Sequence, residues 1–250
     1  MIRLLLNDAQ WERIAPLLPG EKGDPGRSGE DNRRFVEAVL GIVRAGTPGR
    51  DLPPAFGKWG TVWRRFRRWA RKGVFERIFA ALSGDREFEY ALVDGAIVKV
   101  RRRRRRRKRG TQKQAIGGSR RGLTPKVVAL VDAPGNLARF VLLPGQRHDR
   151  IGVEPLIAGV EFDALIADKA FDTDVLRAML NERSATAVIP AKADRTTPIP
   201  HDAEMYKWRR RIENFFPRIK EFRRIAPRSD KTATRHAAAF HLTAAFLALK

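Results

Sequence analysis

Two short apolar segments of this chain each contain a single aspartate. Asp94 lies within ALVDGAIV, Asp168 ends ALIAD, and both segments have the uninterrupted apolar composition of buried strands. A carboxylate in such a strand costs free energy unless a cation or a hydrogen-bond donor compensates it. One divalent ion would compensate both aspartates if the two strands are neighbours in a sheet. Taken singly, each aspartate also fits a turn or cap residue just past a strand.

The periodicity of the surrounding sequence predicts the fold class. Residues 1–84 carry apolar side chains mostly at helical spacing, whereas the chain from Glu87 reads as strands, then as strand–helix–strand, and from Asp202 as helix. We therefore predict an α/β protein with a helical domain over residues 1–84 and a mixed sheet flanked by helices over residues 85–250. Within the first strand segment, Gly95 is expected to form a turn or bulge.

The charge of the chain limits its partners. Lys and Arg number 51 against 28 Asp and Glu, which gives a net charge of +23. A surplus of this size indicates a polyanionic partner, with nucleic acid first and an anionic membrane surface second. We expect no membrane insertion, because no apolar run approaches the roughly 20 residues of a spanning helix. The lack of cysteine excludes disulfides, cysteine-ligated zinc and thiol catalysis, and it fits a cytoplasmic location.

Two arginine-rich segments are candidate DNA contacts. The run RRRRRRRKRG falls in a predicted basic loop over residues 99–122, where Arg103 and Arg105 are candidate phosphate ligands; a solvated charge run without a defined role is the alternative. The helix expected over residues 59–72 carries tryptophans on its apolar face, and we assign these to packing. Its arginines are candidate phosphate contacts, namely Arg64, Arg65 and Arg68.

A third acid, Glu213, lies in the basic segment MYKWRRRIENFFPRIKEFRR. On a helix, four side chains of this segment fall on one stripe, separate from the apolar stripe: Tyr206, Arg209, Glu213 and Lys220. Glu213 is thus expected outside the core and beside cations. A surface ion pair between Glu213 and Arg209 is the plain alternative. Pro217 is expected to kink this helix, because it cannot donate a backbone hydrogen bond.

A histidine follows another predicted strand. His148, in PGQRHD, is a candidate for contact with a phosphate or a water near the acids. A lone histidine in such a place is more often a capping or packing residue, so both interpretations stay open.

Several long segments of the chain match those of a known family: LLLNDAQWERIAPLLPG, RDLPPAFGKWGTVWRRFRRWARKGVFERIF, GLTPKVVALVDAPGN, LIADKAFD and YKWRRRIENFFPRIKEFRRIAPRSDKTA. On these segments the chain resembles DDE-type bacterial transposases of the insertion-sequence-five group over nearly its whole length. The tyrosine–arginine–glutamate–lysine signature of that group is matched by the stripe described above. The arginine run after Asp94 departs from the family pattern, as does Gly95.

The resemblance implies a ribonuclease-H-like fold behind an N-terminal helical, helix-turn-helix-like DNA-binding domain. It also implies that Asp94, Asp168 and Glu213 are the catalytic acids and hold two Mg²⁺ ions, for which Mn²⁺ can substitute. Arg209 and Lys220 are then expected to hold phosphates beside the ions. Tyr206 is expected to stack on a base or contact a phosphate, with helix packing as its alternative role.

The function implied by the resemblance is DNA transposition. It comprises binding of double-stranded DNA at the terminal inverted repeats, metal-dependent strand cleavage, and transfer of the 3′-hydroxyl end to target DNA. A homodimer or larger assembly is expected, because two ends must be handled together, and the expected location is the bacterial cytoplasm in association with the nucleoid. Two alternatives stay open: a catalytically inactive, repressor-like DNA-binding relative, and a simple metal-dependent nuclease.

Overall fold

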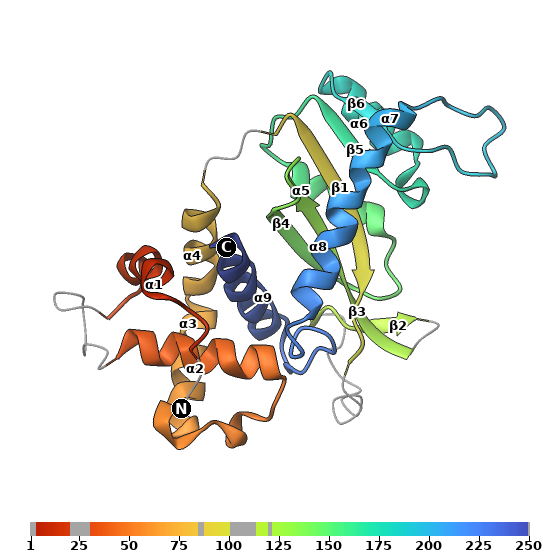
Figure 1. Ribbon diagram of the computed structural model, residues 1–250. Coiled ribbons are helices and arrows are strands. Elements are labelled where there is room, and N and C mark those ends of the chain that lie inside the picture. Colours follow the sequence, from red (N-terminus) through yellow and green to blue (C-terminus); the bar gives the residue numbers. More distant parts are fainter. Residues whose placement is uncertain (1–3, 21–30, 85–87, 101–113, 120–121, 250) are drawn as a thin grey trace. The chain divides into compact units, whose positions relative to one another are not determined.

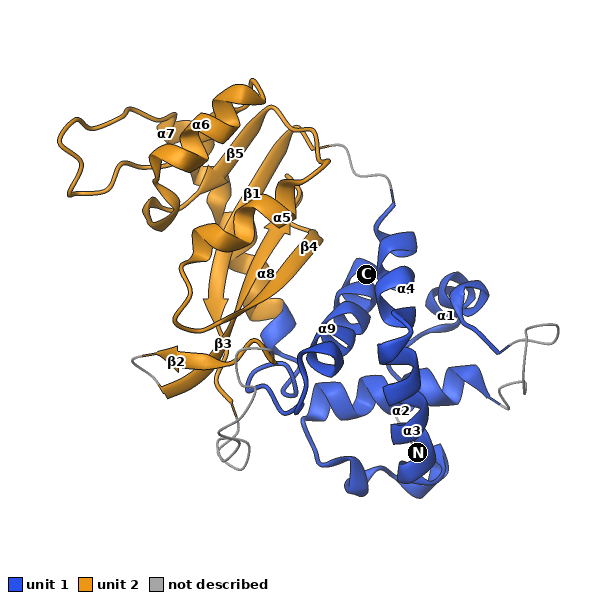
Figure 2. Ribbon diagram, turned by 180° about the vertical axis from the view of Figure 1, so that it is seen from behind, with its two compact units in different colours: residues 1–84, 101–104, 219–250 blue, residues 85–100, 105–218 orange. Residues whose placement is uncertain are grey.

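The computed structural model describes residues 4–20, 31–84, 88–100, 114–119 and 122–249 (Figure 1). These residues form two compact units, which Figure 2 colours separately. The helical unit comprises the described part of residues 1–84 together with residues 219–249. The sheet unit comprises the described part of residues 88–218.

The helical unit is built from α-helices joined by short 3₁₀ turns. The helices are α1 (Asp8–Ile14), α2 (Asn32–Ala45), α3 (Trp59–Arg71), α4 (Val74–Ser83) and α9 (Ala233–Ala248), and the turns are η1 (Ala15–Leu17), η2 (Gly49–Asp51) and η3 (Pro54–Phe56). Three helices begin with a side chain that accepts a backbone N–H of the first turn, from Asn7, Asp31 and Thr232. These caps satisfy donors that the helix itself leaves unpaired.

The last helix, α9, belongs to the helical unit because it is apolar on nearly all sides. Its buried side chains include Phe240, Leu242 and Phe246, and a helix of this kind needs neighbours on every face. One of these neighbours is α4, which runs beside it (Figures 1 and 2). The sequence pattern assigns residues 219–250 to the sheet domain, whereas residues 219–249 pack with the described part of residues 1–84.

Helix α3 packs through the apolar face that its spacing predicts. Trp69 is 3% exposed and meets Phe35 of α2 edge-on, with ring centroids 4.8 Å apart. Trp59, the first residue of α3, is 45% exposed, so the packing role predicted for it is wrong. Helical spacing gives the direction of a side chain but does not tell how far a neighbouring element extends to cover it.

The sheet unit contains a six-stranded sheet. Its strands are β1 (Tyr90–Ile97), β2 (Gly117–Ser119), β3 (Gly122–Val131), β4 (Leu137–Pro144), β5 (Ala164–Ala167) and β6 (Thr186–Val188). The strand order is β2-β3-β1-β5-β6, and β4 also pairs with β3. β3 runs antiparallel to β1, β2 and β4, whereas β1, β5 and β6 are parallel to one another. The predicted α/β class is therefore confirmed, with the antiparallel-then-parallel order of a ribonuclease-H-like fold.

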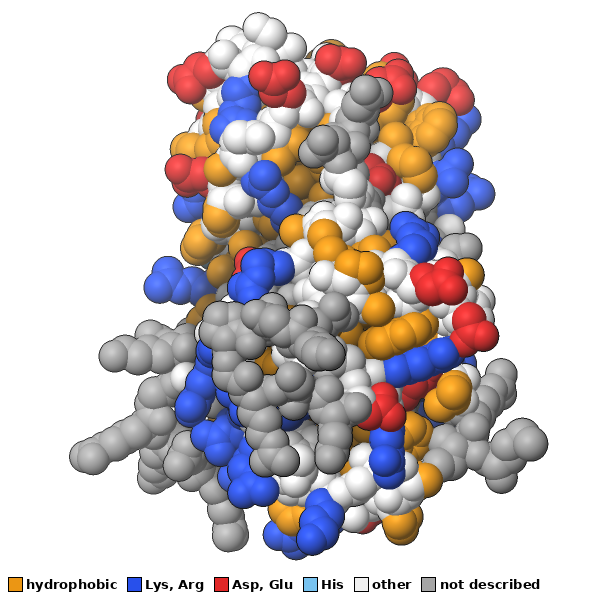
Figure 3. Space-filling model, turned by 90° about the vertical axis from the view of Figure 1, so that its left-hand side faces the viewer, with side chains coloured by type: hydrophobic (Ala, Val, Ile, Leu, Met, Phe, Trp, Pro, Cys, Tyr) orange, Lys and Arg blue, Asp and Glu red, His pale blue; other side chains and the backbone are white. Residues whose placement is uncertain are grey.

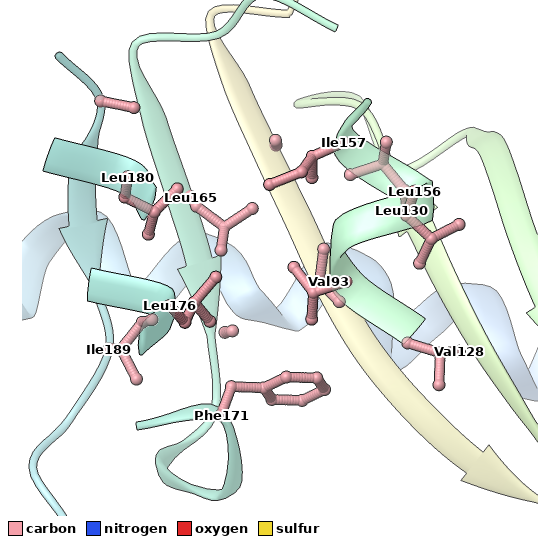
Figure 4. Close-up of a cluster of buried hydrophobic side chains, with 14 residues drawn as sticks. Val93, Val128, Leu130, Leu156, Ile157, Leu165, Phe171, Leu176, Leu180 and Ile189 are labelled. Atoms are coloured by element: carbon pink, nitrogen blue, oxygen red, sulfur yellow. The ribbon is translucent and has the colours of Figure 1, made fainter. Parts of the chain in front are cut away.

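Helices cover both faces of the sheet. One face carries α5 (Val153–Ile157) and α6 (Asp174–Glu182), which follow the 3₁₀ turns η6 (Asp149–Gly152) and η7 (Lys169–Phe171). Between these helices and the sheet lies an apolar core with Val93, Leu165 and Leu176 (Figure 4). The other face carries α8 (Arg210–Lys220), which follows α7 (Ala203–Tyr206) and η8 (Lys207–Arg209) (Figures 1 and 2). α8 continues through Pro217.

Strand β1 runs straight through Gly95, so the turn or bulge predicted there is wrong. Gly95 pairs with Val128 of β3 as a regular antiparallel position. A Cβ atom at Gly95 would lie 2.8 Å from Cγ of Asp149, so the missing side chain makes room for this carboxylate. Glycine here serves a close approach of another side chain rather than a turn.

Part of the predicted basic loop over residues 99–122 is a strand. β2 pairs with the start of β3, from Gly117 opposite Thr124 to Ser119 opposite Gly122. Arg103 and Arg105 lie outside the described residues. The phosphate contacts expected of these two arginines stay predictions.

Candidate active site

The pairing of β1 with β5 brings two aspartates together. The parallel register of these strands ends with Val93 opposite Ala167, and the next residues are Asp94 and Asp168. Neighbouring residues at one register position point to the same face of a sheet, and Val93 points into the core under α5 and α6. Both carboxylates therefore lie on the opposite face, along which α8 runs. Their side chains are 16% and 31% exposed.

Helix α8 and the turn before it add Glu213 and Arg209 to this face. The Arg209 guanidinium places Nη2 3.3 Å from Oδ2 of Asp94 and 3.8 Å from Oδ2 of Asp168. Its Nη1 lies 2.6 Å from Oε1 of Glu213. The ion pair between Glu213 and Arg209 thus exists, but the same guanidinium also faces both aspartates. Three acids far apart in the sequence converge around one cation.

Each aspartate uses one oxygen for the backbone and directs the other at Arg209. The N–H of Gly95 donates to Oδ1 of Asp94 over 2.7 Å, and the N–H of Ala170 donates to Oδ1 of Asp168 over 2.7 Å. Asp168 therefore also caps the turn η7, which is the plain role considered for it. These bonds fix both carboxylates and leave their Oδ2 atoms turned toward the same cationic group.

The directions of the pKa shifts show which groups favour and which oppose charge in the site. Burial raises the pKa of Asp94 above its ordinary value, while the Gly95 N–H and Arg209 lower it and the charges of Asp168 and Asp149 raise it further. Burial disfavours the charge of Arg209, but the neighbouring acids outweigh burial and raise its pKa. A cation among these acids therefore stabilises the ionised form of Asp94.

The donor set fits a hard divalent cation. Two aspartate oxygens directed at one cationic group, with a glutamate beside it, are the ligand type that Mg²⁺ and Mn²⁺ prefer. Among the described residues, no three His, Cys, Asp or Glu side chains stand close enough as they lie to hold a metal ion. The arrangement therefore fits a metal on the condition that the Arg209 side chain moves away and Glu213 turns inward.

Asp149 is a charged neighbour that the sequence reasoning missed. Its carboxylate lies against Gly95, on the opposite face of β1 from Asp94, and is 2.8 Å from Nζ of Lys126. The sequence held one clue to this contact. Gly95 departs from the family pattern, and a missing side chain there leaves room for an acid such as that of PGQRHD. His148, the predicted candidate in that segment, is exposed and its side chain makes no cap hydrogen bond.

The other predicted residues lie in varied surroundings. Tyr206 meets His201 edge-on, with ring centroids 5.3 Å apart. Lys220 is the last residue of α8 and belongs to the helical unit. On α3, Arg64 and Arg68 are exposed. Arg65 instead bonds Asn32 and lies over two aromatic rings of the core, 4.4 Å from Phe35 and 4.6 Å from Trp69.

Family models match most of the chain. A model described as a transposase DDE domain matches residues 88–248, and one described as a transposase of the IS4/5 family matches residues 6–79. The chain therefore belongs to the DDE transposases. More narrowly, the chain belongs to the insertion-sequence transposases of this group, as the resemblance implied.

One of three similar proteins is itself described as a transposase. The chain is 37% identical over 130 residues to a protein of Brucella ovis described as a transposase for insertion sequence element IS6501, covering 51% of this chain and 100% of that protein. It is 38% identical over 96 residues to the protein y4sN of Sinorhizobium fredii, covering 38% of this chain and 75% of that one. A protein of the insertion element IS402 from Burkholderia cepacia is 32% identical over 111 residues, covering 40% of this chain and 76% of that protein.

Two solved structures show more distant similarity. A piggyBac transposase synaptic complex with hairpin DNA has 12% identity and a TM-score of 0.42, covering 79% of this chain. The present chain spans about half of that one, 51%. A pre-cleavage Mos1 transpososome has 10% identity and a TM-score of 0.26, covering 91% of this chain and 81% of that one. No helix in the described part of the chain has the length and apolar character to cross a bilayer.

Proposed function

We propose that this transposase binds the inverted-repeat ends of its own element, cleaves them, and joins the liberated 3′-hydroxyl ends to target DNA. The observation that carries the proposal is the convergence of Asp94, Asp168 and Glu213 on the single guanidinium of Arg209. Three clustered carboxylates repel the phosphates of DNA. A protein that binds DNA at such a cluster therefore needs cations there to neutralise the acids. The proposed place of action is the bacterial nucleoid, where element and target DNA both lie.

The three acids would hold two divalent ions. Asp94, whose carboxylate is the most buried of the three, would be a ligand together with Asp168 and Glu213. Bound there, the ions supply activation of the attacking water or 3′-hydroxyl and stabilisation of the leaving oxygen. Mg²⁺ is the proposed ion, with Mn²⁺ as a substitute.

Arg209 would exchange partners when the ions bind. A guanidinium and a divalent cation repel each other at the same carboxylates, so Arg209 must leave Asp94 and Asp168. Its planar fork matches a phosphate as well as a carboxylate, and a scissile phosphate beside the ions is then its nearest anion. Arg209 would therefore hold the substrate, with Lys220 further along α8 as a second phosphate ligand.

Exposed arginines would bind the DNA backbone. Lys and Arg side chains gather in the lower part of the face shown in Figure 3. On α3, Arg64 and Arg68 are exposed, which suits contacts to phosphates rather than to a protein core. A homodimer or larger assembly is part of the proposal, because two DNA ends must be brought together.

The experiment is an assay of the purified chain with Mg²⁺ and a DNA fragment that carries the ends of its element. Joined products are expected. Cleavage without joining would instead indicate a nuclease. Binding without any cleavage would indicate an inactive DNA-binding relative, an alternative favoured by one observation, that Arg209 already compensates all three acids.

A further inference from the structure

The helical unit contains an open pocket that the transposition chemistry does not use. Its volume is about 820 Å³, which is within the usual range for small-ligand sites. Three parts of the helical unit form its walls: α2, the stretch from residue 47 into α3, and residues 224–231. Its lining includes three aromatic rings and three cationic side chains, from Trp59, Trp63, Phe66, Arg50, Arg224 and Lys231.

Two tryptophans give the pocket flat aromatic walls. Trp59 is 45% exposed, although the apolar pattern of α3 predicts burial for it. Trp63 is partly buried and stacks on Phe66, with centroids 5.7 Å apart and rings inclined by 29°. Arg235 and Arg224 both lie over the Trp63 ring, at 5.2 and 6.0 Å, and these contacts fix the position of the ring. An exposed ring beside a fixed one can accept another flat ring at little cost in side-chain entropy.

The charges in the pocket are all positive. None of its described lining residues is an Asp or Glu. Arg224 is compensated by Asp230, with bonds of 2.9 and 3.2 Å. Arg50 lies over the Trp59 ring at 5.9 Å, and neither Arg50 nor Lys231 forms an ion pair with any described residue. The pocket therefore combines flat apolar walls with two uncompensated cations at its edge.

We infer that this pocket takes a single unpaired nucleotide of a DNA strand. The base would lie against Trp59 and Trp63, and its phosphate would meet Arg50 or Lys231. A paired base cannot reach such walls, because its faces are covered by the stack, whereas an extrahelical base exposes both faces. The inference rests on the proposed function, which supplies the DNA, and it adds a preference for distorted DNA.

The test compares two duplexes of one sequence, fully paired or with one unpaired 2-aminopurine. The full chain should bind the duplex with the unpaired base roughly 10-fold more tightly, as a base–aromatic stack provides. The 2-aminopurine fluorescence should be quenched on binding. Trp59→Ala should remove the preference and the quenching with little effect on binding to the paired duplex, whereas Trp59→Phe should keep most of both.

Trp208→Ala is the matched control, since Trp208 is 42% exposed but lies outside the pocket. It should leave the preference unchanged. Circular dichroism and thermal unfolding establish that each variant is folded. Equal affinity for the two duplexes, or a preference that survives Trp59→Ala, would overturn the inference and leave the proposed function standing. Failure to bind either duplex would contradict the proposed function itself.

Discussion

Arg209 of the sheet unit and two arginines of α3 in the helical unit lie in opposite electrostatic settings. In the sheet unit, one guanidinium, that of Arg209, faces three carboxylates at 2.6–3.8 Å. In the helical unit, Arg64 and Arg68 are exposed and form no ion pair with any described residue. The difference separates two uses of positive charge. Arginines without an ion-pair partner are free to bind the phosphates of DNA. Arg209 instead neutralises acids whose proposed ligands are divalent cations.

The largest effect should come from the acid at the centre of the compensated site. Asp94→Asn removes the charge of the most buried of the three proposed metal ligands, so DNA cleavage should fall by at least ~1000-fold, on the scale of a lost catalytic group. DNA affinity should change little, because the contacts to the backbone remain. Gel assays of cleavage and binding measure both quantities. The charge-matched control is Glu161→Gln, an exposed acid away from the site, and cleavage by Asp94→Asn at the control rate would refute the assignment.

A second cluster of paired charges, Asp172 with Arg177 and Arg195, tests whether charge compensation alone marks a reactive site. The carboxylate of Asp172 is fully buried and binds Arg195 at 2.7 Å, Arg177 at 2.8 Å and the N–H of Lys192 at 2.9 Å. Burial opposes its charge, but these hydrogen bonds outweigh burial and hold the pKa of Asp172 well below its ordinary range. Asp172→Asn should lower the free energy of unfolding by about 3–5 kcal/mol, as for other broken buried pairs.

The pH dependence of unfolding checks the role of Asp172. The unfolded chain binds a proton at Asp172 near the ordinary pKa of about 4, above the folded value, so this stabilisation is complete above that pH and is lost as the pH falls. The urea midpoint of the wild-type chain should therefore drop between pH 5 and pH 3 more than that of Asp172→Asn. If the wild-type chain and Asp172→Asn lost stability in parallel as the pH falls, the ion pairs of Asp172 would not stabilise the fold. The expected result would assign Asp172 to folding, in contrast to the role in chemistry proposed for Asp94.

The next effect concerns metal affinity. Arg209→Gln removes a competitor for the acids, so Mn²⁺ should bind about 10-fold more tightly, the result of relieving one close charge repulsion. DNA cleavage should nevertheless fall, because the proposed phosphate ligand is lost. Titration calorimetry and a cleavage assay measure the opposite changes. Arg211→Gln, at the start of α8, is the control, since Arg211 packs over Trp208 rather than against the acids. Equal metal affinity in both variants would remove Arg209 from the site.

The smallest effects are expected on α3. Arg64→Gln and Arg68→Gln should each weaken DNA binding by a few-fold for all sequences and reduce the slope of log affinity against log salt by about one. Arg65→Gln should instead lower the melting temperature, because Arg65 lies over Phe35 and Trp69. Filter binding over a salt series, with thermal unfolding beside it, distinguishes these results. A change in salt slope for Arg65→Gln equal to that for Arg64→Gln would erase the distinction.

The sequence predicted the convergence of the acids better than their partners. Asp94 and Asp168 could be predicted to share one cation, because acids without a compensating charge are rare in apolar strands. Side chains alternate between the two faces of a strand, so neighbouring strands in register place both acids on the same face. Helical spacing placed Glu213 outside the core beside cations, and the family resemblance grouped it with the two aspartates. The shared contact with Arg209 could not be predicted, because the position of α8 on the sheet depends on contacts far apart in the chain.

The same limit explains the predictions that the structure changes. Local patterns gave α9 its helical state but not its neighbours in the helical unit. They gave Trp59 its direction but not its exposure, and they suggested a turn at Gly95 where a distant carboxylate, Asp149, needs space. In each case the missing information was which other segment lies beside the residue.

The most direct measurement locates the metal itself. Fe²⁺ bound in place of Mg²⁺ generates radicals that cut the polypeptide close to the ion, and mass spectrometry identifies the cut positions. The account predicts cuts in the strands and helix around Asp94, Asp168 and Glu213 that are suppressed by excess Mg²⁺ and absent in Asp94→Asn. Cuts elsewhere in the chain, or cuts that persist in Asp94→Asn, would contradict the claim that these three acids hold the catalytic ions.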